Sequence, residues 1–119
     1  MINKIKQEWE NIIFNAVFVI LTFLFVIIFY KNIILTTVLI GLLSIIGLIE
    51  WKSKLTLIIF IFGAIFGVMA EIIAAYYNIW NYTFANFYDV PLWLFIVWGN
   101  ATAFIYQTAL ESKKLGVKH

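Results

Sequence analysis

Glu71 is the residue whose type and position most suggest chemistry in this chain of 119 residues. It follows the apolar stretch 55–70 and precedes a second one, 72–75, which would place an acidic side chain at membrane depth. Such a residue is costly in a bilayer, and it usually faces a bundle interior or a cavity and has a function there. We predict a catalytic acid or base at Glu71. The alternative is a structural carboxyl group, kept protonated by burial and hydrogen-bonded to Asn100 or to a tyrosine.

Asn100 is the polar residue expected to meet Glu71. With a helical rise of about 1.5 Å per residue, Glu71 lies roughly 13 Å below Trp80 at the outer interface. By the same rise, Asn100 lies roughly 12 Å below Leu92 on the next, antiparallel helix. The two side chains therefore share one depth. The sequence predicts a hydrogen bond between them and a place for Asn100 in the ligand site.

Gly63 and Gly67 lie on the same face of the predicted helix as Glu71. Small residues four positions apart let a second membrane helix approach closely. We expect these two glycines to pack against a helix of the same chain. The alternative is a contact with a second copy of the chain or with another membrane protein.

Aromatic residues surround the predicted position of Glu71. A protonated carboxylic acid can give a proton to an alkene, and each desolvated aromatic face can stabilise the resulting cation by about 2 kcal/mol. Tryptophan and tyrosine also gather at membrane interfaces without binding anything, which is the simpler interpretation. The predicted ligand-binding aromatic residues are Trp80, Tyr82, Trp93 and Trp98.

The composition predicts one all-α membrane domain covering residues 1–119. Hydrophobic residues make up 65% of the chain and charged residues 12%, whereas soluble domains are about half apolar and a quarter charged. A spanning helix needs roughly 20 apolar residues. We expect a short interfacial helix at 1–10 and an outer loop at 79–90, with Asp89 capping the helix that follows. The four predicted transmembrane helices are 11–30, 33–49, 55–78 and 91–110.

The lysines predict how these helices are oriented. The chain has eight lysines and no arginine, and only Lys31 lies in a predicted outer segment. Cytoplasmic segments of membrane proteins are enriched in such residues. We therefore predict a multi-pass protein of the cell membrane with both termini in the cytoplasm. The lysines assigned to the cytoplasmic side are Lys4, Lys6, Lys52, Lys54, Lys113, Lys114 and Lys118.

The order of Glu71, Trp80, Tyr82 and Pro91 resembles the membrane carotenoid-biosynthesis proteins of the small lycopene cyclase subunit and carotenoid hydratase type. In those families an acidic residue in a helix precedes an aromatic pair and a proline that opens the next helix. The resemblance implies a polytopic fold and an isoprenoid or carotenoid-like ligand. The families also carry a Glu-Glu pair after the proline, whereas this chain continues with Leu92. The usual cyclisation chemistry is therefore not implied.

Several functions are excluded by the composition. The chain has no cysteine, and its acidic residues are too scattered for a metal site, so we predict neither a metal nor a cofactor. A net charge of +2 gives no support for a nucleic-acid partner. The favoured function is binding of an isoprenoid or another apolar lipid around Glu71, with or without acid–base chemistry. The alternatives are a small proton-coupled homodimeric transporter and a non-enzymatic membrane assembly subunit.

Overall fold

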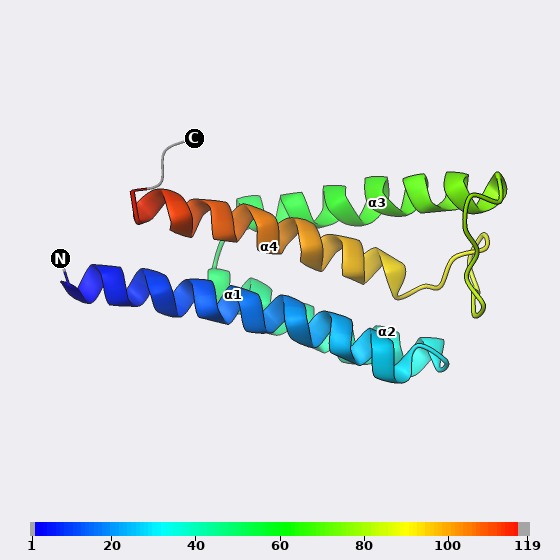
Figure 1. Cartoon of the computed structure of the whole chain (residues 1–119), viewed down its shortest axis with the longest axis horizontal. Coiled ribbons are helices and arrows are strands. Elements are labelled where there is room, and N and C mark those ends of the chain that lie inside the picture. The colour runs from blue at the N-terminus through cyan, green and yellow to red at the C-terminus, as the bar shows by residue number, and fades with distance from the viewer. Residues whose placement is uncertain (1, 117–119) are drawn as a thin grey trace.

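The computed structural model describes residues 2–116, and it is an elongated bundle of helices (Figure 1). The start of α1, the end of α4 and the α2–α3 connection lie at one end of the bundle. The α1–α2 turn and the long segment between α3 and α4 lie at the other end. Lys118, one of the lysines used to predict the orientation, lies outside the described residues. The helices are α1 Ile2–Phe29, α2 Ile33–Trp51, α3 Lys54–Tyr76 and α4 Leu94–Lys114.

The prediction of an all-α fold is confirmed, with differences at the helix ends. The segment expected to form a separate interfacial helix at 1–10 is continuous with α1. The last helix begins at Leu94, three residues after Pro91, and Trp93 precedes it without a side-chain cap. The predicted cap at Asp89 is wrong. Instead, the side-chain oxygen of Asn86 accepts a hydrogen bond from the backbone N–H of Leu92 at 2.9 Å.

The inside of the bundle mixes polar and small residues with a hydrophobic cluster around Ile40 and Val68, and most large aliphatic side chains lie on the outside. Three of the four helices, α1, α2 and α3, are long and apolar enough to cross a membrane. Their large side chains point outward, as at Ile34 and Ile49, which are 73% and 66% exposed. Such large exposed apolar surfaces mark contact with a membrane or a partner. The fold is therefore that of a membrane protein.

The fourth helix, α4, contacts each of the other three. Its buried positions include Asn100 and Gln107, which in an apolar environment need hydrogen-bond partners. Asn100 donates to Thr22 of α1 at 3.1 Å and accepts from Ser44 of α2 at 2.6 Å. Gln107 donates to Thr56 of α3 at 2.8 Å. Polar side chains of α4 thus bond to all three neighbouring helices.

Glycines allow α3 and α4 to approach closely. A methyl group at Gly63 would overlap the side chain of Thr102, and one at Gly67 would overlap the indole ring of Trp98. The hydroxyl of Thr102 in turn donates to the backbone carbonyl of Ile59 across the same contact. Both glycines therefore pack against a helix of their own chain.

We expect Asn100→Leu to lower the free energy of unfolding by about 1–2 kcal/mol, because it removes two interhelical hydrogen bonds with little change in volume. Reversible unfolding in mixed detergent micelles measures this value. Thr37→Val is the matched control, since the Thr37 hydroxyl bonds to the carbonyl of Ile33 in its own helix. Equal stability of the Asn100 variant and the control would contradict the proposed role of Asn100.

Candidate functional site

The carboxylate of Glu71 accepts hydrogen bonds from three aromatic side chains. Oε2 accepts from the indole N–H of Trp80 at 2.7 Å and from the hydroxyl of Tyr82 at 2.8 Å. Oε1 accepts from the indole N–H of Trp98 at 3.3 Å. The acceptor lies on α3, two donors lie in the segment 77–93, and the third lies on α4. Glu71 therefore joins three parts of the chain, and we call this set the Glu71 cluster.

A reversal of the chain just after α3 makes the Glu71 cluster possible. Asn78 has a positive φ of 57°, a conformation that asparagine adopts more readily than most residues. The N–H of Ile79 then bonds back to the carbonyl of Ala74 at 2.9 Å. These contacts turn the chain back, so that Trp80 and Tyr82 reach a carboxylate that lies before the end of α3. On the other side, Gly67 leaves the space beside α3 that the indole of Trp98 occupies.

The donors around Glu71 match the hydrogen-bonding capacity of a carboxylate. An ionised carboxylate only accepts hydrogen bonds, and an indole N–H only donates. Of the two partners predicted for a structural Glu71, the tyrosine is found, as Tyr82, and Asn100 is not. The three donors occupy three of about four lone-pair sites of the carboxylate, so Oε1 keeps one site without a bonded donor.

Tyr82 is held in its protonated form. Burial, the hydrogen bond to Glu71 and the negative charge of Glu71 all raise the pKa of Tyr82 above its usual value of 10.0, with burial the largest cause. The phenol therefore remains a donor at physiological pH. It also packs edge-on against Trp93, with ring centroids 6.4 Å apart.

The predicted hydrogen bond between Glu71 and Asn100 does not form in the described part of the chain. Asn100 is fully buried and bonded to Thr22 and Ser44, as described above. The physical reason is rotation about α4, since residues two apart point about 200° away from each other on a helix. Trp98 faces Glu71, so Asn100 must face α1 and α2. Asn100 is a packing residue here and is not part of the Glu71 cluster.

A cavity of about 390 Å³ adjoins the Glu71 cluster. Tyr82 belongs to the Glu71 cluster and also lines the cavity, and Trp93 forms part of the cavity wall. The Trp93 side chain is only 8% exposed, yet its indole N–H has no hydrogen-bond partner among the described residues. We call this space the outer cavity. Its lining residues are Val26, Ile27, Tyr30, Asn81, Tyr82, Thr83, Phe84 and Trp93.

The contribution of the first helix to the outer cavity was not foreseen from the sequence. Three of the eight lining residues, Val26 and Ile27 at the end of α1 and Tyr30 just after it, lie far along the chain from the predicted site. Tyr30 packs edge-on against Phe84 with ring centroids 5.9 Å apart, which brings α1 to the segment 77–93. In the sequence, the one feature that could link Tyr30 to this cavity is its position at the same predicted membrane interface as Tyr82. Within residues 2–116, no group of three acidic or histidine side chains could hold a metal ion.

No protein-family model matches this chain, and no curated protein or solved structure matches it at a significant level.

Titration of Tyr82 tests the geometry of the cluster. The phenolate absorbance of Tyr82 is obtained by subtracting the spectrum of Tyr82→Phe from that of the wild type. We expect it to appear only well above pH 10, because the pKa of Tyr82 in the folded protein is raised from 10.0. The stability that this shift contributes is fully present below about pH 10 and is lost as the pH rises through the folded-state pKa. A phenolate signal with a midpoint near pH 10 in the folded protein would contradict the buried bond to Glu71.

Substituting Glu71 tests whether the cluster holds the segment 77–93 in place. Glu71→Gln turns one acceptor oxygen into a donor, so at least one aromatic donor loses its partner. The lost hydrogen bond should lower the free energy of local opening of this segment by about 1 kcal/mol. Amide hydrogen exchange in residues 79–84 should then be roughly fivefold faster. Glu10→Gln, on the exposed surface of α1, is the matched control. Exchange that is unchanged in 79–84, or equally faster in all helices, would argue against this role.

Proposed function

We propose that this chain is a four-span protein of the cell membrane, with both termini in the cytoplasm, that binds an isoprenoid-like or another apolar lipid in the outer cavity. The observation that supports this most is the cavity itself, which is largely apolar and has in its wall Trp93, a residue whose indole N–H is buried and unpartnered. Ligand sites commonly combine apolar walls with a few fixed polar groups. The lysine distribution supports the orientation.

A lipid chain has a direct route to the outer cavity along α1. Ile27 lines the cavity and is 66% exposed, and Ile20 and Phe23 continue the same helical face toward the middle of α1. These side chains lie where bilayer lipid would contact the helix. A ligand can therefore place one end in the cavity and leave its remaining chain along α1, without a tunnel through the bundle.

The unpartnered indole N–H of Trp93, a wall residue of the cavity, suggests which group the ligand carries at its inserted end. A buried N–H without a partner costs about 1–3 kcal/mol, and an oxygen acceptor on the ligand would recover this. The proposed ligand is therefore an apolar chain with a hydroxyl or carbonyl oxygen, rather than a pure hydrocarbon. Trp93 donates to that oxygen, and the ring of Tyr82 covers the adjoining wall.

Glu71 serves this site through Tyr82. Glu71 does not line the outer cavity, whereas Tyr82 does, and their hydrogen bond of 2.8 Å joins the two. The carboxylate thus positions the wall of the cavity. Any proton moving between a ligand and Glu71 would pass through the Tyr82 hydroxyl, so the geometry supports binding more directly than turnover.

No observation on this chain favours the other two functions. A homodimeric transporter or an assembly subunit would use the face of Gly63 and Gly67, and that face is occupied by Thr102 and Trp98 of the same chain. A second copy therefore finds no small-residue face there.

Direct binding of geranylgeraniol to the detergent-purified protein tests the proposal. We expect saturable binding, measured with radiolabelled alcohol, and a loss of roughly tenfold or more in affinity when Ile27→Trp fills the cavity. Ile105→Trp is the matched control, since Ile105 is 64% exposed on α4 and does not line the cavity. Trp93→Phe should weaken binding of the alcohol about fivefold but leave binding of the hydrocarbon phytane unchanged.

The proposal would be wrong if the wild type showed no saturable binding, or if Ile27→Trp and Ile105→Trp bound equally well. Equal weakening of alcohol and hydrocarbon by Trp93→Phe would remove the role assigned to its N–H.

A further inference from the structure

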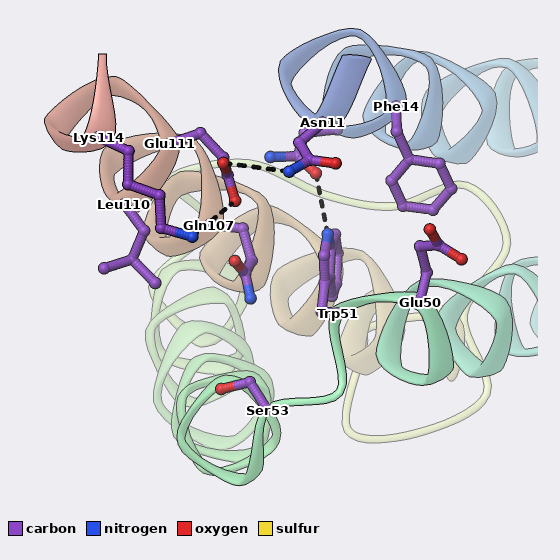
Figure 2. A pocket seen from close by; sticks show the side chains of 10 residues that line it. Asn11, Phe14, Glu50, Trp51, Ser53, Gln107, Leu110, Glu111 and Lys114 are labelled. Atoms are coloured by element: carbon purple, nitrogen blue, oxygen red, sulfur yellow. Dashed lines mark hydrogen bonds and ion pairs between the residues drawn. The ribbon is translucent and has the colours of Figure 1, made fainter. Parts of the chain in front are cut away.

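A second cavity lies at the opposite end of the bundle, where α1 begins and α4 ends (Figures 1 and 2). Its volume is about 270 Å³, which equals the liquid volume of roughly nine water molecules. Residues of α1, α2 and α4 line it, together with Ser53 at the start of α3. We call it the inner cavity. Unlike the outer cavity, it is lined by charged side chains, the acidic Glu50 and Glu111 and the basic Lys114.

The amide and indole donors at the wall of the inner cavity already donate within the protein, whereas the hydroxyl of Ser53 only accepts a hydrogen bond, from the N–H of Thr56. Asn11 donates to Glu111 at 3.2 Å, and Asn15 donates to Thr108 at 3.4 Å. The indole N–H of Trp51 donates to Asn15 at 2.8 Å. The amide nitrogen of Gln107 donates to Thr56, outside the cavity lining.

The groups that remain for a ligand are mainly acceptors. The side-chain oxygen of Gln107 and the carboxylate of Glu50 accept no hydrogen bond from the described residues. Glu111 is 6% exposed, and its carboxylate has only the bond from Asn11 and a long ion pair of 3.7 Å with Lys114. The Lys114 side chain is itself half exposed. A buried carboxylate with so little compensation favours a further positive donor beside it.

The neighbouring turn of α1 adds to this excess of acceptors. Glu8 precedes Asn11 by three residues and so shares its helical face. Its side chain is 6% exposed, and one carboxyl oxygen has no hydrogen-bond partner among the described residues. Two buried acidic side chains, Glu8 and Glu111, therefore lie where α1 and α4 meet at this end.

The aromatic residues at the inner cavity indicate what kind of cation fits. Phe14 and Trp51 both line it, with ring centroids 6.1 Å apart and planes nearly perpendicular. In Figure 2 the Trp51 ring is drawn between the carboxylates of Glu50 and Glu111. Aromatic faces attract ammonium groups, and a carboxylate can accept their N–H donors. Bare metal ions instead need several converging ligands, and residues 2–116 offer no such group of acids and histidines.

We infer that the inner cavity binds a small organic ammonium group, with Glu111 and Glu50 as its anionic partners and Trp51 as its aromatic wall. The ligand is either a free amine of about the size of ethanolamine or the ammonium headgroup of an aminophospholipid. This inference does not depend on the outer cavity or on the lipid proposed to occupy it.

Isothermal titration of the detergent-purified full chain with ethanolamine tests the inference, with sodium chloride at equal ionic strength as the blank. We expect saturable binding that Glu111→Gln weakens by roughly tenfold or more, because the amide keeps the bond from Asn11 but loses the charge. Glu10→Gln is the matched control, since Glu10 is exposed at the same end of α1 and does not line the cavity. Glu50→Gln, at an exposed position, provides a second variant if Glu111→Gln does not fold.

A second arm distinguishes the two sources of the ammonium group. Protein in nanodiscs of equal phosphatidylethanolamine and phosphatidylglycerol is analysed by native mass spectrometry for the lipid that it retains. Retention of phosphatidylethanolamine that Glu111→Gln abolishes would identify a headgroup, and binding of ethanolamine alone would identify a free amine. Neither binding event in the folded wild type, or identical binding by the Glu111, Glu50 and Glu10 variants, would overturn the inference.

Discussion

The structure depends on finding hydrogen-bond partners for the polar side chains of α4 inside an otherwise apolar bundle. Asn100 and Gln107 can be buried only because Thr22, Ser44 and Thr56 lie opposite them on the three other helices. In a membrane, an apolar side chain gains little by contacting another helix instead of lipid. Interhelical hydrogen bonds and close packing therefore determine which helices pack against each other. The helix α4, which contacts each of the other three, is thus the one around which the others are arranged.

The same requirement explains both candidate sites at the two ends of the bundle. At Glu71 the requirement is met, because the indoles of Trp80 and Trp98 and the Tyr82 hydroxyl all donate to one carboxylate. Beside it, the Trp93 N–H is left without a partner in an apolar cavity. At the other end, the carboxylate of Glu111 is buried with only the bond from Asn11 and the long ion pair with Lys114. An unpartnered donor at one end is the basis for proposing an oxygen-bearing lipid there. Carboxylate acceptors at the other end are the basis for proposing an ammonium group.

The helices could be predicted from the sequence, because they follow from local patterns of apolar residues, and Glu71 was noticed because it interrupts one of them. The link to Trp80 and Tyr82 was also accessible, since these residues lie close to Glu71 along the chain. The partner on α4 was predicted wrongly as Asn100, because equal depth does not fix rotation about the helix axis, and Trp98 takes that place. The inner cavity could not be predicted at all. Its residues, such as Asn11 and Glu111, are 100 positions apart and are brought together only by tertiary packing.

The central proposal is that the indole N–H of Trp93, which is buried without a partner in the wall of the outer cavity, donates a hydrogen bond to the oxygen of a bound lipid. Indole ¹H–¹⁵N NMR spectra of the detergent-solubilised protein, with Trp93 assigned by its absence in Trp93→Phe, observe this group directly. On adding geranylgeraniol, we expect the Trp93 indole proton to shift downfield while that of Trp51, already bonded to Asn15, stays in place. An unchanged Trp93 signal at saturating alcohol, or equal shifts of all indole signals, would contradict the proposed site.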